Sequence, residues 1–121
     1  PNIYLVPPQD YQHFVWLMGH AHFILTDSGG VQEEAPAIGK PLLVLRDVTE
    51  RPSVLESGTM LLVGTDKARI INEASRLLDD EETYTRMSRV HFPYGDGHAS
   101  ELIATRLHAW LSARSTAGDG V

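Results

Sequence analysis

The sequence contains no cysteine among its 121 residues. A disulfide framework, a thiolate nucleophile and a zinc–thiolate cluster are therefore excluded. Positive charge is also scarce, because 10 lysines and arginines stand against 16 acidic residues, giving a formal net charge of -6. No basic run could follow a phosphate backbone, so nucleic acid is not an expected partner. A bound anion would have to be held by backbone N–H groups and one or two well-placed cations.

Long hydrophobic runs are absent as well. The run Met60–Val63 is far too short to span a bilayer, and no basic-then-apolar leader opens the chain. We therefore expect no membrane partner and a cytoplasmic location. The chain begins at Pro1, and the strand-like run Ile3–Val6 follows almost at once. This beginning predicts an N-terminus that has been cut or processed.

What is present is enough apolar material for one globular domain, at 42% hydrophobic residues. Four short apolar runs each precede a turn signal and residues that can form a helix. These runs are Ile3–Val6, Phe23–Thr26, Leu42–Leu45 and Thr59–Val63. Continuous apolar runs alternating with helices are typical of a parallel sheet covered on both faces, which predicts an α/β fold. Four strands make a small sheet, and both of its edges would need covering.

Helices are expected between and after these strands. Asp10 can cap the first helix and Gly19 can end it in a left-handed conformation. A second begins at Asp66, a short one covers 81–88, and a last one covers 97–113. The second and last should be amphipathic, with apolar faces formed by Ile70, Ile71, Ala74, Leu77 and Leu78, and by Ile103, Leu107, Trp110 and Leu111. Residues 1–114 therefore form the domain, and the small, polar residues 115–121 are expected to be a disordered tail.

An anion site is predicted directly after the second apolar run, where Asp27-Ser28-Gly29-Gly30 precedes a helix start. Glycines let a ligand approach the backbone, and first-turn N–H groups with the helix dipole favour negative charge. The turn also lies at the carboxyl end of a parallel strand, where ligands settle in open sheets. The alternative is that Ser28 is an N-cap and the glycines only make a tight turn.

Three further residues are candidates for the same site. Glu34, one turn into the helix, could accept both hydroxyls of a ribose, or it could be a solvated acid favoured by the dipole. Arg51, in the charged loop Arg46–Pro52, offers fork-shaped donors to oxyanions, or it could pair with an acid to order the loop. Phe14 could flank a nucleobase, or it could be a core residue.

Pro36 predicts a kink, or a short helix ending at Gly39.

Six histidines invite a metal interpretation, but His20 and His22 are the only close pair and no acid lies at ligand spacing. We therefore expect no metal site.

Three segments together carry a family resemblance: Thr26–Pro36, Gly39–Pro41 and Arg46–Pro52. They resemble the signature stretch of non-hydrolysing UDP-N-acetylglucosamine 2-epimerases. The similarity continues through Glu56–Thr59, Leu62–Thr65 and Pro93–Gly97, so it covers nearly the whole chain except the tail.

The resemblance implies the distal part of the C-terminal domain of a GT-B-like enzyme that has two Rossmann-like domains, with the UDP-sugar between them. Such enzymes interconvert UDP-N-acetylglucosamine and UDP-N-acetylmannosamine by eliminating and re-adding UDP, without metal or nicotinamide cofactor, in cell-envelope polysaccharide biosynthesis. By resemblance, Ser28, Gly29 and Gly30 hold the diphosphate and Glu34 holds the ribose. Gln9 and Phe14 then lie on the uridine side, and Arg51 lies on the phosphate or sugar side.

The family's catalytic carboxylates belong to the N-terminal domain, and a histidine and arginine segment belongs to the earlier C-terminal domain. This chain contains neither, so we assign it no catalytic residue and expect it to be inactive alone. Its expected partners are UDP or the UDP-sugar, those absent segments and, in the full-length protein, a second copy. A GT-B glycosyltransferase domain and a non-catalytic truncated module remain alternatives.

Overall fold

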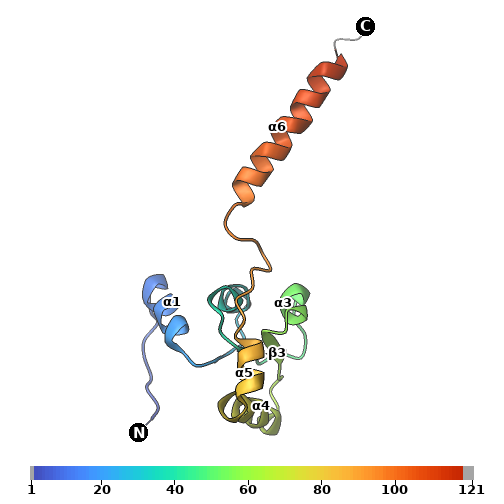
Figure 1. The fold of residues 1–121 in the computed structure, drawn as a ribbon. Coiled ribbons are helices and arrows are strands. Elements are labelled where there is room, and N and C mark those ends of the chain that lie inside the picture. Colours follow the sequence, from blue (N-terminus) through green and yellow to red (C-terminus); the bar gives the residue numbers. More distant parts are fainter. Residues whose placement is uncertain (1, 119–121) are drawn as a thin grey trace.

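The computed structural model describes residues 2–118, with side chains through residue 114. Three short parallel strands and seven helical segments make up the described chain (Figure 1). The strands are β1 (Ile24–Thr26), β2 (Leu42–Val44) and β3 (Met60–Leu62). The helices are α1 (Tyr11–His20), α2 (Gly29–Glu34), the 3-10 helix η1 (Ala35–Ile38), α3 (Pro52–Glu56), α4 (Lys67–Asp79), α5 (Glu81–Met87) and α6 (Ala99–Gly118).

The sheet has the order β1-β2-β3, and its register aligns Ile24 with Leu42 and Leu42 with Met60. The central strand β2 has all three of its residues fully buried. A strand that is apolar on both sides needs cover on both sides, because its side chains alternate between the faces of the sheet. The predicted parallel α/β architecture is confirmed.

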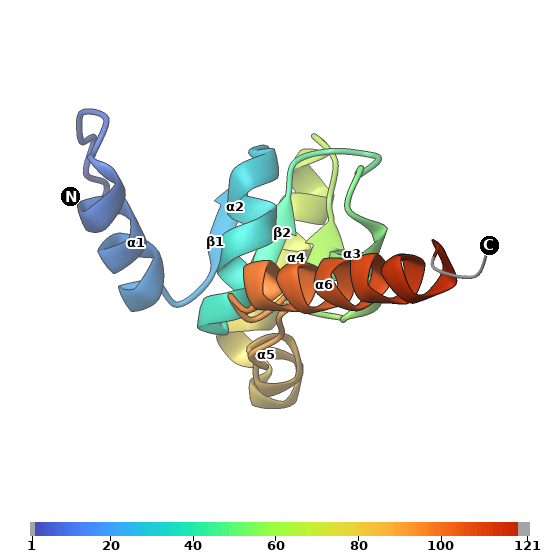
Figure 2. The same cartoon turned by 90° about the horizontal axis from the view of Figure 1, so that it is seen from above.

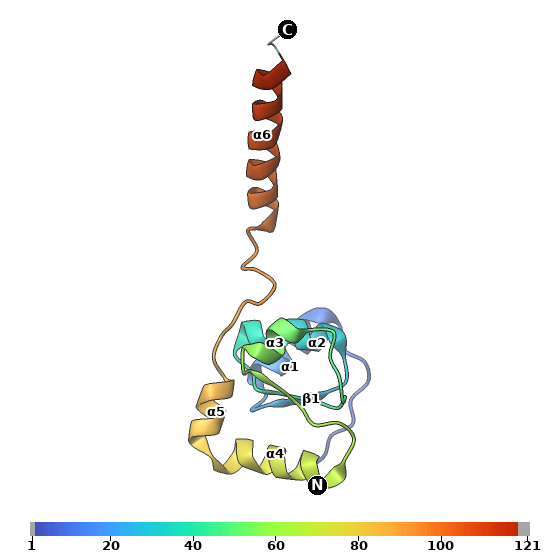
Figure 3. The same ribbon diagram turned by 90° about the vertical axis from the view of Figure 1, so that its right-hand side faces the viewer.

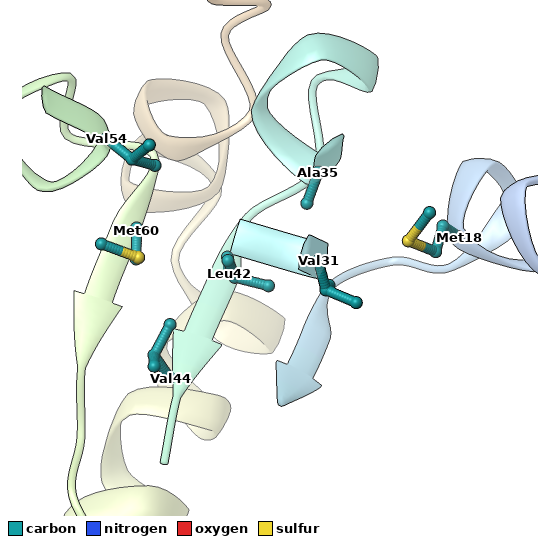
Figure 4. Packing of buried hydrophobic residues seen from close by; sticks show 7 residues of the cluster. All are labelled: Met18, Val31, Ala35, Leu42, Val44, Val54 and Met60. Carbon is teal, nitrogen blue, oxygen red and sulfur yellow. The ribbon is translucent and has the colours of Figure 1, made fainter. Parts of the chain in front are cut away.

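Helices cover the sheet from both faces, which gives three layers (Figure 3). On one face, residues of α1, α2, η1 and α3 pack with the strands (Figure 4), in a buried cluster of Met18, Val31, Ala35, Leu42, Val44, Val54 and Met60. On the other face, α4 and α5 pack in a second cluster of Leu43, Val63, Leu77 and Met87. Leu43 therefore points away from Leu42 and Val44, as strand alternation requires.

The predicted strand Ile3–Val6 is wrong, and the described sheet has three strands rather than four. Residues 2–10 lie apart from the sheet, beyond α1 (Figure 2). Leu5 is 97% exposed, so its apolar side chain packs on nothing. A strand exists through hydrogen bonds to a neighbouring strand, and in the described sheet β1 pairs with β2 alone. An apolar run without a neighbour therefore stays irregular.

The first helix begins as predicted and ends differently. Asp10 caps it by accepting a hydrogen bond from the His13 backbone N–H over 2.9 Å. Gly19 is not the stop, because α1 continues through His20. Ala21, in an extended conformation, ends the helix and donates its N–H to the carbonyl of Leu17. An extended residue after the last turn makes a left-handed glycine unnecessary.

The short helical segment around Pro36 is confirmed. α2 tightens into η1 at Ala35, and Gly39 follows with a φ of 65°. A Cβ on Gly39 would lie 2.8 Å from the carbonyl oxygen of Ser88. Glycine is thus required at this position both by the left-handed conformation and by the close backbone approach.

The second half of the chain forms the predicted helices with two differences. In α4, which Asp66 caps, Ile71 and Leu78 are exposed rather than packed, because the second cluster takes Ile70, Ala74 and Leu77. The last helix, α6, continues through Gly118, so residues 115–118 are helical rather than a tail, and 119–121 lie outside the described residues.

The helix α6 projects away from the layered body (Figure 1). Its apolar face is therefore more than half exposed, through Leu102, Ile103, Leu107, Trp110 and Leu111. Within residues 2–118, no helix is both long and apolar enough to cross a bilayer.

Candidate functional site

Three loops meet at the carboxyl edge of the sheet, because neighbouring parallel strands end on the same side. The loop after β1 contains Ser28, the loop after β2 contains Asp47 and Arg51, and the loop after β3 contains Gly64. The last two loops touch, since a Cβ on Gly64 would lie 2.6 Å from Oδ1 of Asp47. The sheet thus gathers the predicted glycine turn and the charged loop into one place.

The glycine turn has the geometry of a helix start. Ser28 is the N-cap of α2, and its Oγ accepts a hydrogen bond from the Val31 N–H over 3.5 Å. Neither Gly29 nor Gly30 has a positive φ. A Cβ on Gly30 would approach Ser28 Oγ at 3.9 Å, which is ordinary contact. Ser28 is therefore an N-cap, as the alternative proposed, and neither glycine is required here by a left-handed backbone.

Arg51 lies beside the first glycine of that turn. Its Nη2 atom would be 3.3 Å from a Cβ on Gly29, so the guanidinium lies against the helix start. Its Nε and Nη2 atoms lie 2.8 and 2.7 Å from Oε1 of Glu33, and this hydrogen bond raises the pKa of Arg51 above its usual value. A longer contact of 3.4 Å joins Arg51 to Glu50. Arg51 thus lies beside the glycine turn, and the pairing with an acid that stood as the alternative is formed.

Glu34 connects the site to the first helix. Its Oε2 atom accepts a hydrogen bond from the Tyr11 hydroxyl over 3.2 Å. The carboxylate raises the pKa of Tyr11 above its usual value, because the neutral hydroxyl is the form that donates and a negative charge stands beside it. Glu34 remains partly exposed. It is therefore neither a freely solvated acid nor a buried one.

The two residues expected on the uridine side lie in different surroundings. Phe14 is 40% exposed and lies on α1, where it helps to form an apolar recess against β1 and α2. This recess is lined by Phe14, Leu17, Met18, Ala21, Phe23, Ile24, Leu25, Thr26 and Val31. Gln9 precedes α1, and its side-chain amide donates to the carbonyl of Pro7 over 2.7 Å. The recess that Phe14 lines also includes Thr26 and Val31, which flank the glycine turn in sequence, whereas Gln9 makes a local contact.

Four residues that contact the candidate site residues were not identified from the sequence: Tyr11, Gln32, Glu33 and Thr49. Gln32 and Thr49 are hydrogen-bonded to each other across 17 positions of sequence, which no local pattern reveals. Gln32 alone had a usable signal, because its spacing of four residues from Pro36 places both on the buried side of the helix.

The close pair of histidines makes structural contacts. His20 Nδ1 lies 2.7 Å from the carbonyl oxygen of Trp16, and the ring of His22 stacks on Tyr84 at 4.1 Å. Residues 2–118 contain no group of three or more metal-ligating side chains placed to hold an ion.

Comparison with known proteins gives one consistent result. The family model described as UDP-N-acetylglucosamine 2-epimerase matches residues 1–108. The UDP-N-acetylglucosamine 2-epimerase of Escherichia coli (strain K12) is 60% identical over 106 residues, which are 88% of this chain and 28% of that protein. The chain therefore spans less than a third of the length of this curated relative.

Solved structures agree in fold and in extent. The UDP-GlcNAc 2-epimerase from Neisseria meningitidis bound to UDP-GlcNAc is similar with a TM-score of 0.83 and 48% identity, over 90% of this chain and 29% of that one. The S. aureus MnaA-UDP co-structure is similar with a TM-score of 0.80 and 48% identity, over 89% of this chain and 30% of that one. Both structures are therefore similar to this chain in sequence as well as in fold.

Proposed function

This chain belongs to the UDP-N-acetylglucosamine 2-epimerase family, and from that membership we propose that it forms the UDP-binding portion of an enzyme interconverting UDP-N-acetylglucosamine and UDP-N-acetylmannosamine. One observation carries the proposal for this chain itself. A helix start whose first two residues, Gly29 and Gly30, carry no side chain lies against the guanidinium of Arg51, at the sheet edge where nucleotides bind in such folds.

Each predicted site residue has a role in this proposal. Ser28, Gly29 and Gly30 hold the diphosphate, and Arg51 supplies the cation on the phosphate or sugar side. Glu34 accepts the ribose hydroxyls. Phe14, and Gln9 after turning from Pro7, lie on the uridine side, with the recess beneath Phe14 offering an apolar floor.

The reaction explains why tight binding of UDP matters. Elimination breaks the bond between the sugar and the β-phosphate oxygen, so negative charge develops on that phosphate as UDP leaves. Donors already pointing at this position stabilise the charge without reorganising, and the same donors hold UDP for re-addition. Arg51 also contributes a positive charge, which its ion pairs with Glu33 and Glu50 partly offset.

The other residues that the reaction needs belong to the part of the relatives' sequence that this chain does not span. We propose that the acid and base groups of the reaction lie there, so that this chain alone binds but does not epimerise. We also propose that the complete protein works as a homodimer in the cytoplasm, without a cofactor, in the synthesis of cell-envelope polysaccharide.

Calorimetric titration of the 121-residue chain with UDP tests the site. Glu34→Ala should weaken binding roughly 10- to 100-fold, because hydrogen bonds to a charged acceptor are worth about 1.5–3 kcal/mol. Tyr11→Phe is the matched control, since it removes the hydroxyl bound to Glu34 and leaves the carboxylate. A folded wild-type chain that takes up no UDP would refute the proposed site, as would equal affinity in Glu34→Ala.

A further inference from the structure

The helix α2 contains a buried polar residue whose amide nitrogen and oxygen are both hydrogen-bonded. Gln32 is 1% exposed, so it cannot touch a ligand. Its Nε2 donates to the Ser28 carbonyl over 3.2 Å, and its Oε1 accepts from the Thr49 hydroxyl over 2.7 Å. A carbonyl oxygen can only accept, so the Ser28 contact fixes which end of the amide is nitrogen. Burial of such a group costs stability unless it is paired, as it is here.

Thr49 extends this chain of hydrogen bonds into the charged loop. Its hydroxyl donates to Gln32 and accepts from the backbone N–H of Arg51 over 3.0 Å. Three bonds thus run in one direction, from the Arg51 N–H through Thr49 and Gln32 to the Ser28 carbonyl. They join the loop after β2 to the glycine turn after β1, which are otherwise separate segments of chain.

The two residues at the ends of this series of hydrogen bonds, Ser28 and Arg51, belong to the two halves of the proposed diphosphate site. At one end, Ser28 is the cap of the helix start; at the other, Arg51 holds its guanidinium 3.3 Å from a Cβ position on Gly29. The Glu33 carboxylate holds the Arg51 side chain from α2, one residue after Gln32. The backbone of Arg51 is thus held through Thr49 while its side chain is held by Glu33.

We propose that Gln32 is a positioning residue which, through Thr49, fixes the backbone of Arg51 against the Ser28–Gly30 turn and so preorganises the grip on a nucleoside diphosphate. The ligand class rests on the proposed function, whereas the bracing of Arg51 does not. A donor held in its binding position before the ligand arrives loses little freedom on binding, which is how a residue without ligand contact raises affinity.

Amide hydrogen exchange followed by NMR on the 121-residue chain tests the bracing without any ligand. Thr49→Val keeps the side-chain shape and removes the hydroxyl, while Thr49→Ser keeps the hydroxyl. The Arg51 amide should exchange roughly three- to tenfold faster in Thr49→Val, as expected for loss of one hydrogen bond, and should recover in Thr49→Ser. The amide of Val63, bonded to the Val44 carbonyl in the sheet, serves as the reference.

Gln32→Met gives a second test, because it fills similar space and removes both ends of the amide. It should accelerate exchange at Arg51 more than at Val63. Unchanged exchange at Arg51 in both variants overturns the bracing, and so does an equal rise at Val63, which would make Gln32 a residue of general stability.

Titrations with UDP and with uridine then test the second part of the proposal, that the bracing of Arg51 raises the affinity for a nucleoside diphosphate. Thr49→Val should weaken UDP roughly three- to tenfold and leave uridine unchanged, because the brace serves the phosphate side. An equal loss of affinity for UDP and uridine, or no loss of affinity for UDP, would overturn this second part. A wild-type chain that binds no UDP refutes the proposed nucleotide site and with it this second part. The hydrogen-exchange data still test whether Gln32 and Thr49 brace Arg51.

Discussion

The hydroxyl of Tyr11 donates a hydrogen bond to Oε2 of Glu34 across 23 positions of sequence. This bond ties the start of α1 to the end of α2, and it joins a group that loses a proton at high pH to one that is already negative. The contact therefore has a measurable pH dependence of its own.

The pKa of Tyr11 is raised by the Glu34 hydrogen bond and charge, so the folded state keeps this proton longer than the unfolded state. The resulting stability is present below the unfolded pKa and is lost as pH rises through the folded value. Spectrophotometric titration should show one tyrosine ionising at lower pH in Glu34→Gln than in the wild type. Identical titration curves would contradict the Tyr11–Glu34 contact.

Asp80 should make the chain sensitive to acid. Its carboxylate caps α5 and accepts from the Thr83 hydroxyl and backbone N–H, which lowers its pKa. The stabilisation is present above the unfolded pKa and is lost as pH falls through the folded one. Asp80→Asn keeps a capping side chain without the charge, so its melting temperature should fall less steeply with acid than that of the wild type. Parallel curves would show that Asp80 does not contribute.

Neighbouring leucines on α4 should differ sharply in their contribution to stability. Leu77 is 2% exposed in the second core cluster, whereas Leu78 is 64% exposed. Leu77→Ala should cost about 2–5 kcal/mol of unfolding free energy, because it leaves a cavity. Leu78→Ala should stay within roughly 0.5 kcal/mol. Urea unfolding of the two variants measures the difference, and equal costs would refute the packing of α4 on the sheet.

Gly64 should be intolerant of a side chain for two separable reasons. Its φ is 62°, and a Cβ would lie 2.6 Å from Oδ1 of Asp47. Gly58 has a φ of 76° and open space, so Gly58→Ala measures the backbone cost alone, about 1–2 kcal/mol. Gly64→Ala should cost more, and adding Asp47→Ala should recover the excess. Chemical denaturation of all four proteins checks this; no excess at Gly64 would mean that the two loops do not touch.

Elements with local signals could be predicted from the sequence. Asp10 and Asp66 each precede an apolar-periodic segment, and each caps a helix in the structure. Gly39 follows a proline-containing segment and is the left-handed cap. Caps and turns depend on residues within one helical turn, so the sequence alone contains the information.

Elements that depend on distant partners could not be predicted. Ile3–Val6 has the composition of a strand, but a strand also needs a neighbour, and composition does not name one. The choice of Leu77 rather than Leu78 for the core depends on how α4 is rotated over the sheet. In the site, the glycine turn and Arg51 could be predicted because both follow parallel strands that end at the same edge of the sheet. The hydrogen bond between Gln32 and Thr49 could not, because it depends on how two loops face each other.

The projecting helix α6 makes the chain larger in solution than its mass suggests. Its 20 residues correspond to a rod of about 30 Å. A compact domain of this length has a radius of gyration of about 14 Å. Small-angle X-ray scattering should therefore give a larger radius and a distance distribution with a long shoulder, and the chain should elute early from a size-exclusion column even as a monomer.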